Sequence, residues 1–272
     1  MFQFLSFGSG SCGNCYYISN GNTSVLIDAG VGIRRMKRHF KEYGLKFSSL
    51  KAILVTHDHT DHIKAVGHLS NEFNIPVYTT EKIHDGIRRN YHTTKKIEPS
   101  CVKIIEVGQD FSIDDLRIST FEIPHDASEN IGYSIDFGQD TFTLMTDIGC
   151  PTDDIKKFIS QSGYLVIEAN YDAEMLKNGK YPKPLQDRIR GGFGHLCNTQ
   201  TAETLGECFH ENLKRVWLCH LSEENNHPEL ARKTVEYHLR GLGIIPGKDF
   251  DLEVLKRKIP SGLFTKDCLL YT

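Results

Sequence analysis

The sequence predicts an α/β (α+β) fold in which two β-sheets pack face to face with helices outside, a four-layer αββα sandwich. Short apolar runs rich in β-forming residues come in two blocks, and amphipathic helical patterns follow the strands of each block. The 272 residues are enough for one large domain or two small ones, and no stretch resembles a long polar linker. We therefore expect a single domain over residues 1–272.

Glycine and asparagine turns separate the strands of the first half, with Gly21-Asn22 as a hairpin signal. Ile33, Met36, Phe40 and Tyr43 recur at helical spacing. The expected strands span residues 2–7, 15–19, 24–28, 52–55 and 77–79, and further helices are expected over 63–73 and 82–91.

The second half repeats this pattern, with residues 138–140 as a turn and Asn198 as a helix N-cap. The expected strands span residues 116–123, 131–137, 141–146, 164–168 and 216–219, and the expected helices span 152–160, 198–209 and 228–242.

Composition points to an ordinary globular protein, with 39% hydrophobic and 25% charged residues. No apolar run approaches the roughly 18 residues of a membrane-spanning helix, and the N-terminus lacks a basic head, so we expect a cytoplasmic protein without membrane contact. The eight scattered cysteines are expected to be reduced thiols, and the Cys12–Cys15 spacing is interpreted as a glycine-rich turn.

A net charge of −3 argues against a uniformly basic nucleic-acid binder but leaves room for local patches. Residues 34–41 are basic and are interpreted as a solvated helix face. Residues 177–190 are also basic, and they precede a candidate site residue, His195.

The strongest functional signal is the run His57-Asp58-His59-Thr60-Asp61-His62, directly after the expected buried strand 52–55. Three histidines and two aspartates in six residues are typical of a metal site, since imidazoles and carboxylates are the ligands of zinc, manganese and iron. His57 and His59 are expected to project to the same side of an extended segment.

One loop cannot supply every ligand of two metal ions, and three other strand ends offer more. His125, Asp147 and His220 each follow an expected strand. A single histidine after a strand is usually not a ligand, but the shared position at strand ends favours these residues.

With these motifs the chain resembles the hydrolases of the metallo-β-lactamase superfamily, and it is most similar to their YycJ/WalJ-like branch. Besides the histidine run, the matching stretches are Ser9–Asn14, Leu26–Gly30, Pro124–Ala127, Thr146–Gly149, Glu168–Asp172, Gly194–Asn198 and His220–Asn226. Tyr171 departs from the pattern, because relatives often carry histidine there.

The resemblance implies a dinuclear centre of two divalent ions, with Asp147 bridging the two. One ion would be held by His57, His59 and His125, and the other by Asp61, His62 and His220. Asp28 would orient the histidine loop, and His195 would face the substrate; His195 and Asp61 are the catalytic candidates. Iron flavoprotein relatives usually carry glutamate at the position of His59, which disfavours oxygen reduction.

The predicted reaction is hydrolysis by a hydroxide that bridges the two metals, since metal ions about 3.5–4 Å apart lower the pKa of a shared water. Two divalent ions, two carboxylates and the hydroxide leave about one positive charge, which matches a monoanionic phosphodiester. The resemblance points the same way, to a phosphodiesterase acting on DNA as a 5′-to-3′ exonuclease. His195 is expected to donate a proton to the leaving oxygen or to hold the phosphate, or else to be a structural histidine. The candidate substrate contacts are Lys183, Arg188, Arg190 and Asn198.

Alternatives remain open from the sequence. A small-molecule hydrolase of a thioester, lactone or cyclic phosphodiester would use the same ligands. Glyoxalase II-like enzymes usually append a helical domain, whereas one helix and a final strand region are expected at the C-terminus here, which disfavours that option. A metal-stabilised scaffold without catalysis is a third reading. Zinc and manganese both fit the ligands and iron stays open, since no cysteine occupies a predicted ligand position. No obligate protein partner is evident. The seven other histidines are interpreted as ordinary surface or core residues.

Overall fold

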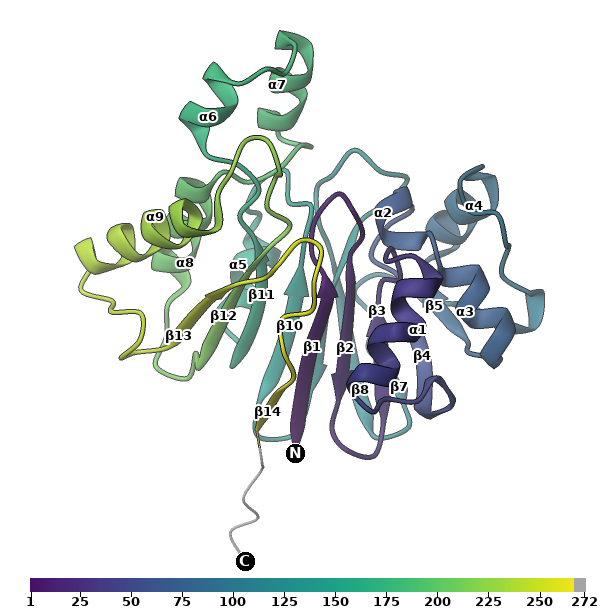
Figure 1. Cartoon of the computed structure of the whole chain (residues 1–272). Helices are drawn as coiled ribbons and strands as arrows, with labels where there is room; N and C mark the ends of the chain where they lie inside the picture. The colour runs from purple at the N-terminus through teal and green to yellow at the C-terminus, as the bar shows by residue number, and fades with distance from the viewer. Residues whose placement is uncertain (267–272) are drawn as a thin grey trace, which may run out of the picture. The chain divides into compact units, whose positions relative to one another are not determined.

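The computed structural model describes residues 1–266, whose strands form two mixed seven-stranded sheets with flanking helices (Figure 1). The chain divides into two compact units, and the boundary falls within the strand over residues 116–122. Unit 1 comprises residues 1–118, 127–129 and 256 onward, and unit 2 comprises residues 119–126 and 130–255. The expected single domain over residues 1–272 stays a prediction.

The sheet of unit 1 has the strand order β14-β1-β2-β3-β4-β5-β6. Strands β14, β1, β2 and β3 pair antiparallel, whereas β3 to β6 pair in parallel, so that β3 and β4 end at the same edge. The strands are β1 (Phe2–Gly8), β2 (Cys15–Ser19), β3 (Ser24–Ile27), β4 (Leu50–Leu54), β5 (Val77–Thr79), β6 (Val102–Ile104) and β14 (Phe264–Lys266). The helices are α1 (Ile33–Glu42), α2 (Thr60–Ile63), α3 (Val66–Phe73) and α4 (Glu81–Arg89), with 3₁₀ turns at Phe47–Ser49 and Pro99–Cys101.

The second sheet has the order β13-β12-β11-β10-β9-β8-β7, and β10 to β13 run parallel. Its strands are β7 (Phe111–Ile113), β8 (Leu116–Glu122), β9 (Ile131–Asp136), β10 (Thr141–Met145), β11 (Tyr164–Glu168), β12 (Arg215–Cys219) and β13 (Asp251–Val254). The helices are α5 (Asp153–Ile159), α6 (Ala173–Asn178), α7 (Lys183–Arg190), α8 (Asn198–Cys208) and α9 (Pro228–Gly241). Buried aliphatic residues of β10 to β12 pack against α5, α8 and α9 in one core.

The expected helix over residues 63–73 is wrong as a continuous element. The structure has α2 and α3 instead, separated at Lys64 and Ala65. The backbone of Ala29, just after β3, explains the break: its N–H donates to the carbonyl of His62 and its carbonyl accepts from the N–H of Ala65, each at 2.8 Å. These bonds replace the helical ones and hold the histidine run against the end of β3.

One further sequence expectation, the N-cap of α8, is wrong. Asn198 is the first residue of α8, not its cap, because the side chain of Cys197 accepts the N–H of Gln200. Helices α6 and α7 were not predicted. The described cysteines are free thiols as expected, while Cys268 lies outside the described residues. No helix among residues 1–266 is long and apolar enough to cross a membrane.

Gly30, in the loop after β3, is packed so closely that a side chain has no space. A Cβ atom there would lie 1.5 Å from the carbonyl oxygen of Asp61 and 2.9 Å from the backbone nitrogen of Asn14. The Gly30→Ala substitution must therefore push the histidine loop away from the sheet, and we expect it to lower the free energy of unfolding by about 1–3 kcal/mol.

Urea unfolding monitored by circular dichroism measures this loss. Gly32→Ala is the matched control, because nothing lies within 4 Å of a Cβ there and the φ angle of Gly32 is −58°. Equal midpoints for Gly30→Ala and Gly32→Ala would contradict the close packing.

Candidate metal centre

In unit 1 the histidine run leaves β4 and enters α2. His57 and His62 are fully buried, and their rings lie 4.0 Å apart between centroids. The ring of His59, the N-cap residue of α2, lies 4.7 Å from that of His57. Asp61 occupies the first turn of α2, and its side chain is 24% exposed. The four candidate ligands of the run thus gather at the edge of the sheet where β3 and β4 end.

The carboxylate of Asp28 binds this loop through hydrogen bonds to Thr56 and His62. Its Oδ1 accepts the N–H of Thr56 at 2.8 Å, and its Oδ2 lies 2.9 Å from the Thr56 hydroxyl and 2.7 Å from Nδ1 of His62. Burial raises the pKa of Asp28, and the charge and hydrogen bonds of His62 act in the opposite direction. Because Nδ1 of His62 donates to this carboxylate, Nε2 keeps the lone pair that a metal ion needs. If Asp28 orients the histidine loop as expected, it must contact a ligand histidine, and its contact with His62 meets that requirement.

Asn14, in the glycine-rich turn after β1, is a further polar neighbour of α2. Its Nδ2 lies 2.8 Å from Nε2 of His62 and 3.2 Å from Oδ2 of Asp61, and its Oδ1 accepts the N–H of Gly10 at 2.8 Å. The backbone N–H of Asn14 also donates to the carbonyl of Asp61 at 2.7 Å. The turn therefore fixes the position of Asp61 and His62, a role that the Ser9–Asn14 motif did not reveal.

In unit 2 the ends of neighbouring strands bring a second set of candidate ligands together. Oδ1 of Asp147, after β10, lies 3.3 Å from Nδ1 of His220, after β12, and 3.7 Å from Nε2 of His125. Nδ1 of His125 is 3.0 Å from the carbonyl of Gly194, which leaves its Nε2 on the side of Asp147. All three side chains are at least nine-tenths buried. His125, Asp147 and His220 therefore share one cluster in this unit.

Glu168 is the member of this cluster that the sequence did not single out. It ends β11, the strand between β10 and β12, and is fully buried. Its Oε1 lies 2.9 Å from Nδ1 of both His195 and His220. Its Oε2 accepts the backbone N–H of Ile148 at 2.9 Å and of Leu196 at 3.1 Å. One atom each from Asp147, Glu168, His195 and His220 lie within 4.8 Å of one another, close enough to surround a cation.

The charges of this cluster shift the pKa values of Glu168 and His195. Burial would raise the pKa of Glu168, but the charge of His195 and hydrogen bonds from both histidines lower it below its usual value. Burial would likewise lower the pKa of His195, but the carboxylate of Glu168 raises it above the usual value. The His195 side chain remains 20% exposed. His195 thus has a raised pKa and still reaches solvent.

The basic residues predicted as substrate contacts lie on α7 and form ion pairs there. Lys183 and Arg190 lie 3.0 and 3.1 Å from Oδ1 of Asp187, and Arg188 pairs with Asp126. Their side chains are 68%, 34% and 63% exposed for Lys183, Arg190 and Arg188. Exposed pairs contribute little to stability, so these cations can exchange an aspartate for another anion.

Asn198 and Tyr171 are interior residues. Asn198 is 1% exposed, and its side-chain amide exchanges two hydrogen bonds with that of Asn226, which corrects its assignment as a substrate contact. Tyr171 packs with Leu176 and Cys197, and burial raises its pKa to about 12. At the position where relatives often carry histidine, this chain therefore has a neutral phenol in a small core.

Comparison with known proteins agrees with this geometry. Residues 23–220 match the model of the beta-lactamase superfamily domain. The chain is 33% identical to exodeoxyribonuclease YycJ of Bacillus anthracis, over 96% of this chain and 98% of that protein. It is 32% identical to exodeoxyribonuclease WalJ of Streptococcus pneumoniae, over 92% of each chain.

Solved structures show the same fold. The metallo-beta-lactamase fold protein YhfI from Bacillus subtilis aligns with a TM-score of 0.70 at 16% identity, covering 96% of this chain and all of that one. Zn²⁺-bound PqqB from Methylobacterium extorquens aligns with a TM-score of 0.70 at 17% identity, covering 96% of this chain and 99% of that one. The predicted fold class and the predicted resemblance are both confirmed. The chain therefore belongs to the metallo-β-lactamase superfamily and is a metal-dependent hydrolase.

Proposed function

We propose that the chain is a dinuclear metal-dependent phosphodiesterase that degrades DNA as a 5′-to-3′ exonuclease. The observation that carries the proposal is the near full-length similarity, above 30% identity, to two proteins named exodeoxyribonucleases. A similarity that covers both chains from end to end applies to the whole architecture and not only to the ligand motif. The substrate class of this chain is therefore inferred from its relatives, and the chemistry from its own residues.

The donor atoms fit two divalent ions. They are imidazole nitrogens and carboxylate oxygens without a thiolate, a set that suits zinc or manganese and also admits iron. In the proposal His57, His59 and His125 hold one ion, Asp61, His62 and His220 hold the other, and Asp147 serves both. The support within each unit is that Nδ1 of His62 and Nδ1 of His125 are already engaged by Asp28 and by the carbonyl of Gly194. That arrangement directs Nε2 of each ring to a metal ion, which at His62 would replace the Asn14 amide now 2.8 Å from Nε2.

Charge favours a phosphodiester over a neutral ester. Two divalent ions bring four positive charges, and the carboxylates of Asp61 and Asp147 offset two of them, so that an anionic substrate is attracted. When bound, such ions polarise phosphoryl oxygens and generate a nucleophile from water at neutral pH.

His195 is proposed as the proton donor to the leaving oxygen. Its Nδ1 donates to Glu168, so the proton on Nε2 is the one available for transfer. The carboxylate of Glu168 raises the pKa of His195, and the partial exposure of the ring lets a substrate reach it. Glu168 itself is a positioning residue, because it acts through His195 and His220.

Replacing Asp147 by alanine tests the proposed reaction. Metal-loaded protein is incubated with 5′- or 3′-end-labelled double-stranded DNA, with bis(p-nitrophenyl) phosphate, and with a thioester. We expect the wild type to cleave both phosphodiesters and to shorten DNA from its 5′ end. Asp147→Ala should lower turnover on the order of 1,000-fold, because several kcal/mol of charge stabilisation by the metals is lost.

Turnover of the thioester with intact DNA and intact bis(p-nitrophenyl) phosphate would refute the phosphodiesterase proposal and favour a small-molecule hydrolase. Degradation from the 3′ end would refute only the proposed polarity.

Glu168→Gln tests the positioning role in unit 2. A glutamine offers one oxygen where the carboxylate accepts four N–H groups, so at least one histidine or backbone amide loses its partner. We expect a 10- to 100-fold loss of metal affinity, on the order seen for carboxylates that orient ligating histidines. Metal content after dialysis against graded chelator is the readout. Glu203→Gln, at an exposed position of α8, is the control. Wild-type metal retention by Glu168→Gln would show that the carboxylate does not orient a metal ligand.

A further inference from the structure

Tyr91 is one of the most exposed large side chains of the described residues, at 83% of its full accessible area. It follows α4 in a tight turn in which Oδ1 of Asn90 accepts the N–H of His92 at 3.0 Å. The rings of Tyr91 and His92 lie 3.9 Å apart, with a 36° angle between their planes. Single exposed aromatic residues are common on protein surfaces. The residues around Tyr91 and His92 therefore determine whether this pair can bind a ligand.

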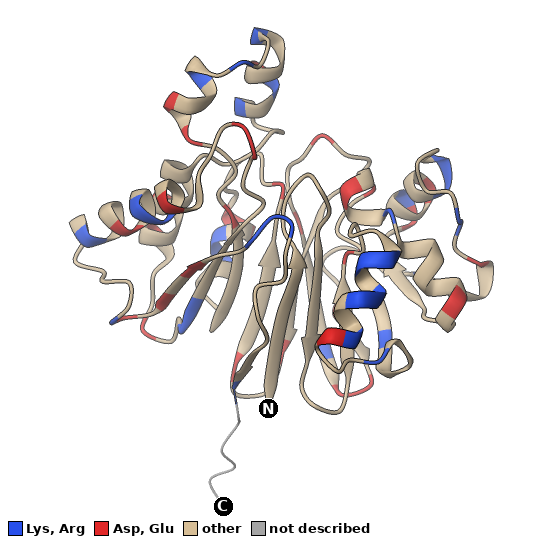
Figure 2. Ribbon diagram, in the orientation of Figure 1, with Lys and Arg blue, Asp and Glu red and all other residues tan. Residues whose placement is uncertain are grey.

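The neighbours are cationic. Residues 85–96 contain Arg88, Arg89, Lys95 and Lys96 against Asp85 alone, a local charge of +3 (four minus one) in a chain whose net charge is −3. Figure 2 shows this charge on α4 and on the connection that follows it. Asp85 pairs with both arginines, yet their side chains remain 71% and 77% exposed. Anions in solution therefore have access to this segment.

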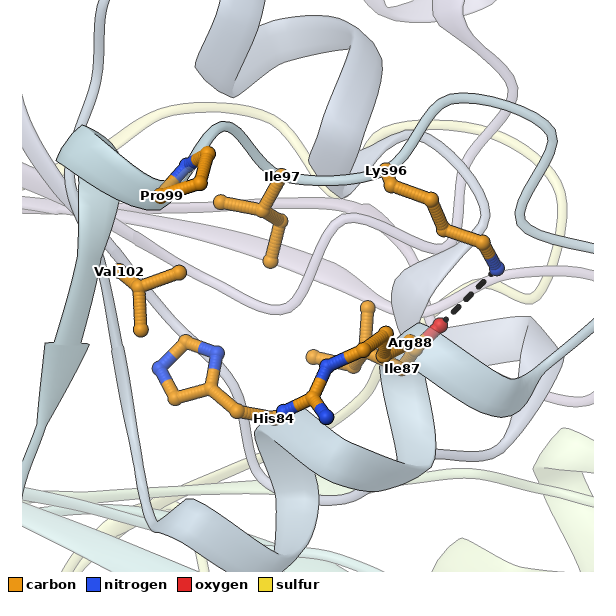
Figure 3. A pocket seen from close by; sticks show the side chains of 7 residues that line it. All are labelled: His84, Ile87, Arg88, Lys96, Ile97, Pro99 and Val102. Carbon is orange, nitrogen blue, oxygen red and sulfur yellow. Dashed lines mark hydrogen bonds between the residues drawn. The ribbon is translucent and has the colours of Figure 1, made fainter.

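Hydrogen bonds hold the segment in place from one side. The amino group of Lys96 donates to the carbonyls of Ile87, at 3.2 Å, and Asn90, at 2.6 Å, as Figure 3 shows for Ile87. A lysine is favourable there because it satisfies carbonyls at the negative end of the α4 dipole. Lys96 is thus exposed but bonded to the turn, and Arg88, Arg89 and Lys95 are the other exposed cations of residues 85–96.

On its other side the segment adjoins the histidine loop. Nδ2 of Asn90 donates to the carbonyl of Asp58 at 3.1 Å, and Asp58 is the residue between His57 and His59. Gly86 of α4 touches the Asp58 side chain so closely that a Cβ there would lie 1.9 Å from Oδ2. A shallow pocket of about 370 Å³ opens at this junction, with Asp58, Arg89 and Tyr91 in its wall.

We propose that Arg88, Arg89, Tyr91, His92 and Lys95, here called the α4 surface, bind a single-stranded stretch of the DNA substrate, an inference that rests on the proposed function. An exposed aromatic ring stacks on any base whose face is free, and adjacent cations neutralise the phosphates on either side. In a duplex the base faces are covered by their neighbours. The combination therefore selects a single strand or an unpaired end, next to the loop that carries His57 and His59.

Binding of metal-loaded, full-length protein to a fluorescein-labelled, phosphorothioate-linked single strand measures this contact without cleavage. Tyr91→Ala should weaken binding on the order of 5- to 150-fold, the range that loss of one base stack produces. Tyr91→Phe should bind like the wild type, because it keeps the ring. Tyr237→Ala removes a tyrosine of α9 that is 84% exposed and should leave binding unchanged.

The cations are tested by salt dependence. Replacing Arg89 and Lys95 together by glutamine should reduce the slope of log K against log salt by about 1.4, since each phosphate contact to a single strand contributes about 0.7. Lys46→Gln, an exposed lysine of unit 1 outside the α4 surface, should leave the slope unchanged.

If Tyr91→Ala binds the single strand with wild-type affinity, or if the wild type does not bind it, the proposed binding role of the α4 surface is overturned. This holds even if bis(p-nitrophenyl) phosphate is cleaved. Binding that depends on Tyr91, by a protein that cleaves neither phosphodiester, would uphold the surface and refute the proposed function. Equal thermal unfolding midpoints show that the exposed substitutions leave the fold intact.

Discussion

In each unit a fully buried carboxylate binds Nδ1 of one or two imidazoles of the candidate site. Asp28 binds His62 after β3, and Glu168 binds His195 and His220 at the end of β11. An ionised carboxylate without partners would cost several kcal/mol to bury, so the donors around each one must stay in place for the fold to be stable. The orientation of the histidines is therefore tied to the stability of the core beneath them.

The backbone at the same strand ends is strained. Among the described residues, Asp28, Asp147 and His220 have φ angles of 59°, 58° and 54°. These angles lie in the left-handed region, which residues other than glycine seldom adopt. Each such residue costs on the order of 1–3 kcal/mol, which the packed sheets must offset. Strain and buried charge thus concentrate at the same positions.

Much of the site could be predicted from the sequence, because its signals are local. The histidine run lies directly after an apolar strand, and His125, Asp147 and His220 each follow a strand. Glu168 could not be found in this way: a single glutamate at a strand end has no distinctive pattern, and its role depends on β11 lying between β10 and β12. Asn198 was misassigned because a helix-start pattern does not distinguish a cap from a buried first residue. The break between α2 and α3 depends on hydrogen bonds to Ala29, more than thirty residues away. The α4 surface could not be predicted from the sequence, because the exposure of Tyr91 and its neighbours is set by the fold.

We propose that the imidazoles and carboxylates held in these two units bind one pair of metal ions. Anomalous diffraction from crystals of the metal-loaded protein tests it most directly. We expect two peaks per chain, one at His57, His59 and His125 and the other at Asp61, His62 and His220, with Asp147 touching both. A single peak, or a peak at Glu168 and His195 in place of that pair, would contradict it.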